Sequence, residues 1–444
     1  MKFSKLLSGR AYRLIALAVT ILMTSLSTIT AFAESAKPMV DPVVQRQVEQ
    51  GAYLARAGDC AACHSTPKGM PFAGGLALTT QFGVIYSTNI TPDKEHGIGK
   101  FSFEEFDRAM REGIADDGEH LYPAMPYTAF AKLSMGDMRA LYAYFMQGVK
   151  PALTKNRKSE LHWPFSIRSL MSVWNLLYLK KGEYASDARR SASWNRGAYL
   201  VQGLGHCGAC HTPRGIAGQE KALSETDGRH YLIGAVADNW FASNLTDDLG
   251  TGLRAWSKEE IVEYLKTGRT ARSAASGAMA QVVGESTQHL RDEDLTAIAE
   301  YLKSLPAASD DAIEPISAAA ADTATRLLRA GATDVRGAQL YLDNCNACHH
   351  SDGAGVQRTF PSLVKSEAVN AKSPASLIHI VLTGSAMPST KTAPSALAMP
   401  DFGWRLSDQD VADVLSFVRS SWGNQAPPVV AHDVARLRKA TVSK

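Results

Sequence analysis

Cysteine is scarce in this chain and is confined to three short motifs. Six cysteines occur among 444 residues, and every one belongs to a Cys-x-x-Cys-His sequence, which leaves none for a structural disulfide. The sequence also lacks a phosphate-binding P-loop and any arrangement that resembles a hydrolytic triad. A Gly-x-Gly-x-x-Gly pattern at 203–208 overlaps the second motif and follows a helical pattern, so it does not indicate a dinucleotide site.

Acidic residues are absent from the first 33 positions. Four cations, an apolar run from about residue 14 to 23 and an Ala-Phe-Ala end make up this segment, which is typical of a secretory signal peptide over residues 1–33. The apolar run is short for a membrane span. Removing the four cations takes the formal charge from +3 to −1. A nearly neutral chain indicates no nucleic-acid partner.

Cys-x-x-Cys-His is the attachment motif of a c-type haem. Two thiols at this spacing add to two vinyl groups of one porphyrin, and the adjacent histidine becomes an axial ligand of the iron. Zinc would need two further ligands at short spacing, and a redox pair would need a βαβ context. The sequence supplies neither. We therefore expect three covalently bound haems c, held by Cys60, Cys63, Cys207, Cys210, Cys345 and Cys348 and ligated by His64, His211 and His349.

Two internal repeats surround the motifs. A Gly-Ala pair precedes each motif, at Gly51, Gly197 and Gly337, in a stretch that reads as a short helix, and the glycine would allow close helix contact. A second repeat starts at Leu133, Leu290 and Leu406 and predicts an amphipathic closing helix. Between the two we expect middle helices at 103–111, 258–266 and 374–382. An acidic loop from Asn89 and Asn244 is shared by the first two domains alone.

These patterns predict an all-α protein of three tandem class I cytochrome c domains, each with one haem c, at residues 40–150, 191–306 and 329–424. A connector at 151–190, a polar linker at 307–328 and a tail at 425–444 complete the chain. The tail is too short and too polar to span a bilayer. Residues 161–179 are aromatic and apolar, which indicates either interdomain packing or a surface that docks a partner or the membrane.

The second axial ligand of an electron carrier is often methionine. Three criteria select candidates: a loop position, a place downstream of the motif, and closeness to the closing helix. Met125, Met279 and Met399 meet them, and Met387 is the alternative in the third domain. Histidine could compete, with His120 as the rival in the first domain. His289 and His379 fit less well, because one abuts a closing helix and the other lies within a middle helix.

Several stretches resemble a known family, including "GDCAACHSTP", "HLYPAMPYT", "GHCGACHTPRG", "SIRSLMSVWNLLYL" and "KTAPSALAMPDFGWRLSDQDVADVLSFVRSSWGN". The chain is similar to the three-haem cytochrome c subunits of membrane-bound dehydrogenases from acetic acid bacteria and their relatives. The resemblance implies that Met125, Met279 and Met399 are the methionine ligands. It also implies a large flavin- or quinoprotein partner with a small third subunit.

The same resemblance implies that the chain delivers electrons to ubiquinone at the periplasmic face of the cytoplasmic membrane. A flavin-dependent gluconate or ketogluconate dehydrogenase is the expected partner, and a quinoprotein alcohol dehydrogenase is the alternative. A freestanding multihaem shuttle or a haem peroxidase forms a second class. A peroxidase would leave one iron without a protein sixth ligand, whereas every domain here offers a methionine. We expect no substrate-oxidising site on this chain.

Overall fold

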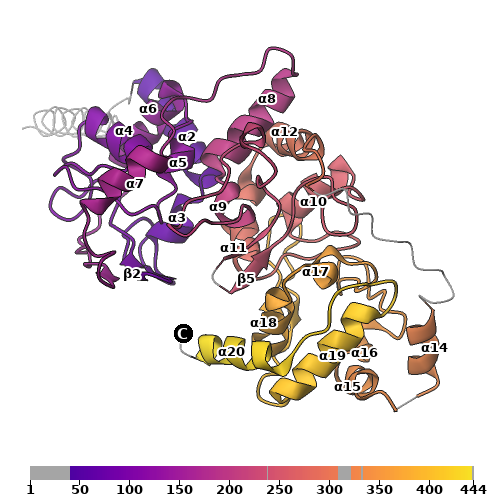
Figure 1. Cartoon of the computed structure of the whole chain (residues 1–444). Helices are drawn as coiled ribbons and strands as arrows, with labels where there is room; N and C mark the ends of the chain where they lie inside the picture. Colours follow the sequence, from indigo (N-terminus) through magenta and orange to yellow (C-terminus); the bar gives the residue numbers. More distant parts are fainter. Residues whose placement is uncertain (1–40, 238, 309–321, 332–333, 443–444) are drawn as a thin grey trace, which may run out of the picture. The chain divides into compact units, whose positions relative to one another are not determined.

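Helices account for most of the regular structure of the chain (Figure 1). The computed structural model describes residues 41–237, 239–308, 322–331 and 334–442. The predicted signal peptide and much of the predicted 307–328 linker lie outside the described residues. Three segments share one order of elements, and we name them repeat one (47–150), repeat two (191–306) and repeat three (322–442). All three belong to one compact part of the chain, Gln47–Lys444.

Each repeat has a helix that leads into the motif, a short helix that carries it, a middle helix and a closing helix. Repeat one contains α2 (Pro42–Ala57), α3 (Cys60–His64), α4 (Phe103–Glu112), α5 (Tyr127–Phe130), α6 (Met135–Ala143) and the π-helix η1 (Tyr144–Gly148). Repeat two contains α8 (Ala192–Tyr199), the π-helix η2 (Leu200–Leu204), α9 (Gly208–His211), η3 (Glu225–Asp227), α10 (Lys258–Thr267), α11 (Gly277–Glu285), η4 (Thr287–His289) and α12 (Asp292–Lys303). Repeat three contains α14 (Thr323–Arg329), α15 (Arg336–Asn344), α16 (Asn346–His349), α17 (Glu367–Asn370), α18 (Ala375–Thr383), α19 (Asp408–Ser420) and α20 (Ala431–Val442). The predicted middle and closing helices are confirmed.

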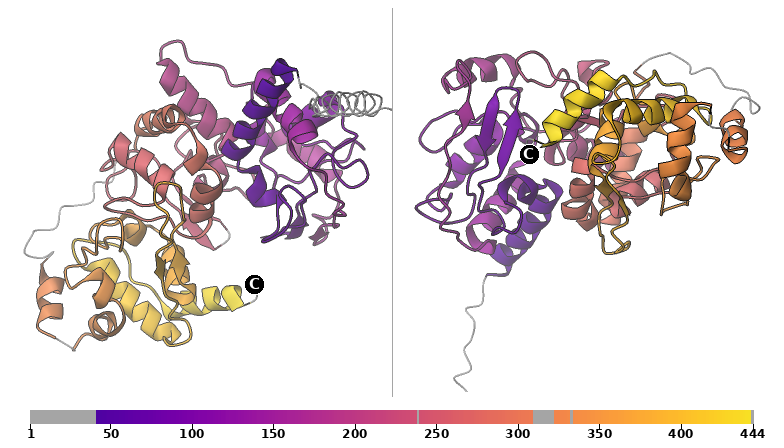
Figure 2. Two further views of the ribbon diagram at one scale, coloured as in Figure 1. Left: turned by 180° about the vertical axis from the view of Figure 1, so that it is seen from behind. Right: turned by 90° about the horizontal axis from the view of Figure 1, so that it is seen from below.

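Three small antiparallel sheets were missed by the all-α prediction. They pair β1 (Ala77–Thr80), β2 (Gly83–Tyr86) and β3 (Glu160–Leu161); β4 (Ala235–Ala237) and β5 (Trp240–Ala242); and β6 (Ser385–Ala386) and β7 (Ala398–Met399). The right-hand view of Figure 2 shows strands of the first sheet as purple arrows. The strands have two to four residues, which is too short for a period of two to stand out in the sequence.

A glycine lets the leading helix of every repeat touch the closing helix. A Cβ placed on Gly51 would lie 1.9 Å from the carbonyl oxygen of Ala140. The corresponding distances are 2.0 Å from Gly197 to Ala297 and 2.4 Å from Gly337 to Asp413. Each carbonyl belongs to the seventh residue after the leucine that opens the second sequence repeat. The predicted close helix contact is therefore confirmed, and any side chain at these glycines would force the helices apart.

Serine capping starts four of the middle and closing helices, α4, α6, α10 and α19, at defined residues. Ser102 with Glu105 and Ser257 with Glu260 form complete capping boxes on α4 and α10. Ser407 with Asp410 does the same on α19. On α6 the Ser134 side chain accepts a hydrogen bond from the Asp137 N–H. Satisfied N–H groups at these starts fix the direction in which each helix leaves its loop.

Repeats one and two share one hydrophobic core, whereas repeat three has its own. The contact between the first two is reciprocal. The Tyr53 hydroxyl donates to Asp294 of α12, and the Tyr199 hydroxyl donates to Asp137 of α6 at 2.7 Å. Both tyrosines follow a Gly-Ala pair, and both aspartates lie four residues after the leucine of the second repeat. The two repeats therefore present equivalent surfaces to each other, as the subunits of a two-fold dimer do.

The π-helix η2 takes up one extra residue. Nine residues separate Gly197 from the first motif cysteine of repeat two, whereas eight separate Gly51 from Cys60. Both ends are fixed, one by the glycine crossing and the other by the motif. A single insertion between fixed ends is accommodated as a π-bulge within the helix.

The connector packs on the surface of repeat one and also contacts repeat two. Its first strand, β3, extends the β1–β2 hairpin. The helix α7 (Leu170–Tyr178) buries Trp174, whose ring meets Tyr127 and whose Nε1–H donates to the carbonyl of Ala217 at 2.9 Å. The other large side chains of α7 are partly or largely exposed. Within α7, packing against both repeats therefore describes Trp174, and Tyr184 after the helix packs against the shared core.

The segment after residue 424 folds back onto repeat three and ends in α20. Val434 and Leu437 are buried and join the repeat-three core. The buried Arg419 donates to the carbonyl of Pro427, and Arg438 donates to the carbonyl of Leu406. Within the described residues, no helix combines the length and apolar character needed to cross a bilayer.

We expect Gly197→Ala to destabilise the protein by about 3 kcal/mol, because the new methyl group would overlap the Ala297 carbonyl. Gly136→Ala is the matched control, since its Cβ would have no neighbour nearer than 3.9 Å in a helix of the same protein. The control should stabilise by roughly 0.5 kcal/mol. Thermal unfolding of both variants measures the difference. Equal unfolding midpoints would show that the close crossing of the two helices does not contribute to the stability of the protein.

Candidate haem sites

A sharp backbone turn places each motif at the end of its leading helix. In repeats one and two the residue before the first cysteine has a positive φ, at Asp59 (50°) and His206 (35°). The motif then forms one helical turn, α3 or α9, and α16 is the equivalent turn in repeat three. Cysteine, cysteine and histidine therefore lie on a single short turn, as attachment to one porphyrin requires.

All three motif histidines are oriented in the same way. The Nδ1 atom lies 2.7 Å from the Thr88 carbonyl oxygen in His64, 2.6 Å from that of Ser243 in His211, and 3.0 Å from that of Pro361 in His349. A carbonyl oxygen can only accept, so Nδ1 carries the proton. The Nε2 lone pair of each ring is then available to a metal, and this is the usual arrangement behind a histidine ligand.

Each histidine is also held through its own carbonyl group. The Gly74 N–H donates to His64 at 2.7 Å, and the Gly234 N–H donates to His211 at 2.8 Å. Gly74 has a φ of 69°, and a Cβ there would lie 2.3 Å from the carbonyl carbon of Thr88. Glycine is required because the two backbone segments that bond the histidine approach each other too closely for a side chain.

A buried polar loop supports the carbonyl groups that orient His64 and His211. Asn89 and Asn244 follow Thr88 and Ser243 directly. In both loops the asparagine Oδ1 accepts from the N–H and the hydroxyl of the threonine two residues later, at 2.7 to 2.9 Å. In the sequence this loop stood out only as an acidic segment that the first two repeats share. The repeated Asn-x-Thr was the signal that could have revealed its supporting role.

Burial gives the motif side chains the protonation states that suit haem attachment. Burial lowers the pKa of His64, His211 and His349, which favours the neutral imidazole that ligates iron. Burial also raises the pKa of the thiols of Cys60, Cys207 and Cys345 to about 12. Such thiols stay protonated at neutral pH, unlike the thiolates of redox-active cysteine pairs.

Repeat three encloses a cavity with the lining that a haem needs. Both thiols and His349 line one side of the cavity, and Met387 and Met399 also line it. Most of the remaining wall is apolar and includes Leu377, Ile380, Val381, Phe402, Val414, Leu415 and Val418. A sulfur ligand, an imidazole and two attachment thiols around one apolar cavity fit a covalently bound haem with two axial ligands.

The β6–β7 hairpin explains why both methionines face this cavity. Ser385 pairs with Met399, and the Met387 N–H donates to the Leu397 carbonyl at 2.8 Å. Residues paired across an antiparallel ladder, and residues two apart on one strand, point to the same face. Met399 also packs against the repeat-three core, which favours it over Met387 as the ligand. The choice between them stays a prediction.

The other two methionines lie in different surroundings. Met125 is partly buried against the shared core, in the loop directly before α5, as predicted. Met279 was expected in a loop, but it lies in the first turn of α11. The helix starts at Gly277, whose φ of 53° lets it pass the Trp240 ring. The sequence did not predict this helix, because its small residues show little of the apolar periodicity of an amphipathic helix.

The competing histidines have partners elsewhere. Asn175 Nδ2 lies 3.3 Å from His120 Nδ1, so the connector contacts this ring. His289 ends the short helix η4. His379 stacks on Trp240 with ring centroids 4.2 Å apart, and its Nδ1 lies 3.0 Å from the Thr383 hydroxyl. These contacts favour the methionines without deciding the ligand of repeat one.

A side chain of repeat two holds the ligand loop of repeat three. Arg269 is 6% exposed, and its guanidinium donates to the carbonyl groups of Ser395, Pro388 and Ala393 at 2.6, 3.3 and 3.4 Å. These carbonyls belong to the loop between Met387 and Met399. The position of the loop therefore depends on a residue outside its own repeat.

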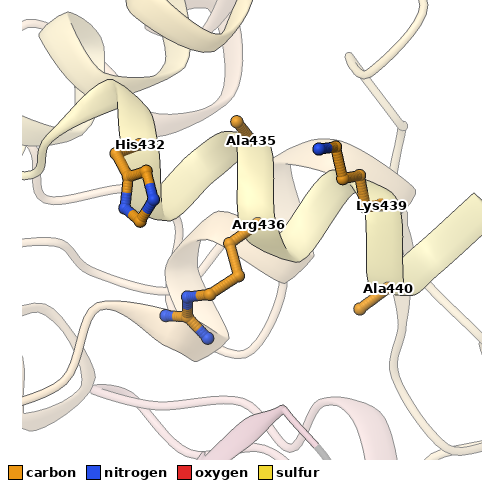
Figure 3. Close-up of a pocket in the computed structure, with 5 residues that line it drawn as sticks. All are labelled: His432, Ala435, Arg436, Lys439 and Ala440. Carbon is orange, nitrogen blue, oxygen red and sulfur yellow. The ribbon is translucent and has the colours of Figure 1, made fainter.

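A second hollow in the described part of the chain has no residues that would attach a haem. A shallow hollow on the outer side of α20 is lined by His432, Ala435, Arg436, Lys439 and Ala440 (Figure 3). It contains no motif residue. In the part of the chain that the structure describes, no three His, Cys, Asp or Glu side chains gather into a further metal site.

Comparison with known proteins agrees with this geometry. The family model for cytochrome c matches residues 195–306 and 335–422, which contain the second and third motifs. The gluconate 2-dehydrogenase cytochrome c subunit of Pantoea cypripedii is 49% identical over 88% of this chain and 89% of its own length. The cytochrome c subunit of the quinone alcohol dehydrogenase of Gluconobacter oxydans is 47% identical over 88% and 82%. The fructose dehydrogenase cytochrome subunit of Gluconobacter japonicus is 38% identical over 91% and 85%.

Met399→Ala should remove about a third of the weak far-red charge-transfer absorption that methionine-ligated ferric haem shows, because one of three ligands is lost. Met387→Ala, on the same face of the same hairpin, is the control and should leave the absorption unchanged. Optical spectra of the oxidised variants measure the effect. Loss of the absorption in the Met387 variant instead would reverse the assignment, and a bis-histidine spectrum from repeat one would favour His120.

Proposed function

The chain belongs to the family of cytochrome c subunits of gluconate 2-dehydrogenase and quinone alcohol dehydrogenase, and from that premise we propose that it carries electrons through three covalently bound haems c. Each haem, when bound, supplies a reversible one-electron couple at its iron. The chain itself attaches the porphyrin, orients the axial ligands and keeps the couple in an apolar environment.

One observation carries the proposal: the orienting bond from histidine Nδ1 to a backbone carbonyl recurs in all three repeats, at 2.6 to 3.0 Å. The bond leaves one free nitrogen per motif and presents it from a fixed direction. Methionine then fills the opposite axial site, with Met125, Met279 and Met399 as the proposed ligands. An iron with both axial sites filled has no open position for a substrate, and this suits electron transfer better than peroxidase chemistry.

The proposed electron donor is a separate catalytic subunit, because the haem motifs account for all the recognised chemistry of this chain. We assign a flavin-dependent gluconate or ketogluconate dehydrogenase, with a small third subunit, as the partner. The relative from Pantoea cypripedii supports this choice. A quinoprotein alcohol dehydrogenase is the second candidate, since the relative from Gluconobacter oxydans is almost as similar.

The proposed acceptor is ubiquinone in the cytoplasmic membrane. Export by the predicted signal peptide would place the chain on the periplasmic side, where c-type haems are attached. The name of the quinone alcohol dehydrogenase supports a quinone acceptor for that relative. The chain would therefore work at the membrane surface, between a soluble substrate and a lipid-soluble acceptor.

The mass of the exported protein tests the haem count. Denatured holoprotein should have the mass of the processed chain plus three haems, because thioether bonds survive denaturation. A variant with Cys207→Ala and Cys210→Ala should carry one haem fewer and provides the control. A wild-type mass that corresponds to two haems would disprove attachment at one motif.

Turnover measurements test the division of labour. The purified holoprotein should oxidise neither gluconate nor ethanol with an artificial acceptor, since it has no substrate site of its own. Its haems should become reduced once the partner dehydrogenase and its substrate are added, which absorbance follows directly. Substrate-dependent reduction without the partner would contradict the proposal.

A further inference from the structure

Within the residues that the structure describes, exposed large apolar side chains concentrate on the connector, between residues 161 and 181. Trp163 is 80% exposed, Leu176 is 84% exposed and Leu177 is 65% exposed. Phe165, Ile167, Leu170 and Val173 are exposed to between 40% and 53%. Exposure of this kind over one short segment exceeds the scattered apolar residues of an ordinary surface and marks an interaction site.

The inner side of α7 is fixed firmly to the protein. Asn175 accepts from the Tyr127 hydroxyl at 2.8 Å and donates to the Glu112 carbonyl at 2.9 Å. Trp174 packs beside it, and Figure 1 shows α7 next to α5. These contacts hold α7 in one orientation on the protein, and this orientation directs Leu176 and Leu177 outward.

The outer side of α7 offers almost nothing to a polar partner. Its exposed large side chains are aliphatic, and the exposed Ser172 uses its hydroxyl to bond the carbonyl of Ser169 at 2.7 Å. Protein interfaces carry about one hydrogen bond per 100–200 Å². A lipid bilayer needs none, because helical backbone groups are already paired and aliphatic side chains enter the acyl region directly.

The charged residues within the segment 161–181 are all basic, and exposed Glu160 and Glu119 lie beside it. Residues 161–181 include no aspartate or glutamate. The side chains of Lys180 and Lys181 are 65% and 67% exposed, whereas those of their partners Asp227 and Glu112 are 19% and 36% exposed. The ammonium groups thus lie further out than the carboxylates. Arg168 contributes less, because its partner Glu119 is itself 58% exposed.

A second segment adjoins this surface. Trp174 bonds the carbonyl of Ala217, and the preceding residue, Ile216, is 97% exposed. Ile216 lies five residues after His211. The apolar surface therefore borders the loop that follows the second haem motif.

We propose that the exposed apolar side of residues 161–181 binds an anionic lipid bilayer, with Leu176, Leu177 and Trp163 in the interfacial region and Lys180 and Lys181 at the headgroups. This inference rests on the proposed function, because a bilayer matters only if the electron acceptor lies in it. Binding here would bring the second haem motif close to a lipid-soluble acceptor.

The experiment uses purified holoprotein and vesicles of phosphatidylglycerol and phosphatidylethanolamine. The double variant Leu176→Glu/Leu177→Glu should bind at least about tenfold more weakly, since two interfacial anchors are lost and two like charges are added. Trp404→Glu is the matched control, because Trp404 is 78% exposed and belongs to repeat three. It should bind as the wild type does. Haem spectra and unfolding midpoints confirm that each variant is folded.

A second variant tests the choice of lipid. Lys180→Gln/Lys181→Gln should lose most of the preference for anionic vesicles over phosphatidylcholine vesicles, and an unchanged preference would contradict an anionic bilayer. Undiminished vesicle binding by the leucine variant would overturn the proposal. So would loss of co-purification with the dehydrogenase while vesicle binding persists, since the surface would then be a protein interface. Haem reduction by the partner in detergent is recorded in parallel, so that failure of membrane binding is separable from failure of electron transfer.

Discussion

The close crossing of the leading helix and the closing helix is the contact on which each repeat depends. At Gly51, Gly197 and Gly337 the backbone of one helix meets a carbonyl oxygen of the other with no space for a Cβ. The leading helix ends in the motif, and the closing helix follows the segment that carries the candidate methionine. This contact between two helices therefore fixes both sides of the haem site, although the contact itself is not made by the candidate haem-binding side chains.

The same elements are used differently in the pair formed by repeats one and two and in repeat three. Tyr53 and Tyr199 each bond an aspartate of the other repeat, and the position after the Gly-Ala pair is occupied by Gln339 in repeat three. Gln339 bonds Asp343 of its own helix instead. The residue at this position is therefore tyrosine in the two repeats that share a core and glutamine in the repeat that has its own core. Repeat three contacts repeat two through other side chains, such as the stacked pair of His379 and Trp240.

Sequence alone predicted the features that are local and repeated. Middle helices, closing helices and the glycine crossings all carry short-range signals, and they occur as expected. The histidine partners could not be predicted, because Thr88 and Pro361 act through backbone carbonyl groups, which any residue supplies. The exposed side of α7 was equally hidden, since an apolar sequence reads the same in a core and on a surface. Only the inward bonds of Trp174 and Asn175 determine which side faces out.

Arg269 shows why the repeats cannot be treated as independent sites. Burying a guanidinium is costly unless its donors are paired. One nitrogen of Arg269, Nη2, donates to three carbonyl groups of the 388–395 loop, whereas its buried Nε has no partner within the described residues. If this loop shifted, the cation would stay buried without partners, which is far worse than a lost surface contact. The penalty holds the loop in place, and with it the hairpin that directs Met387 and Met399 into the cavity of repeat three. A candidate sulfur ligand in repeat three is therefore positioned by a buried cation of repeat two, and this coupling follows from burial rather than from the haem motif.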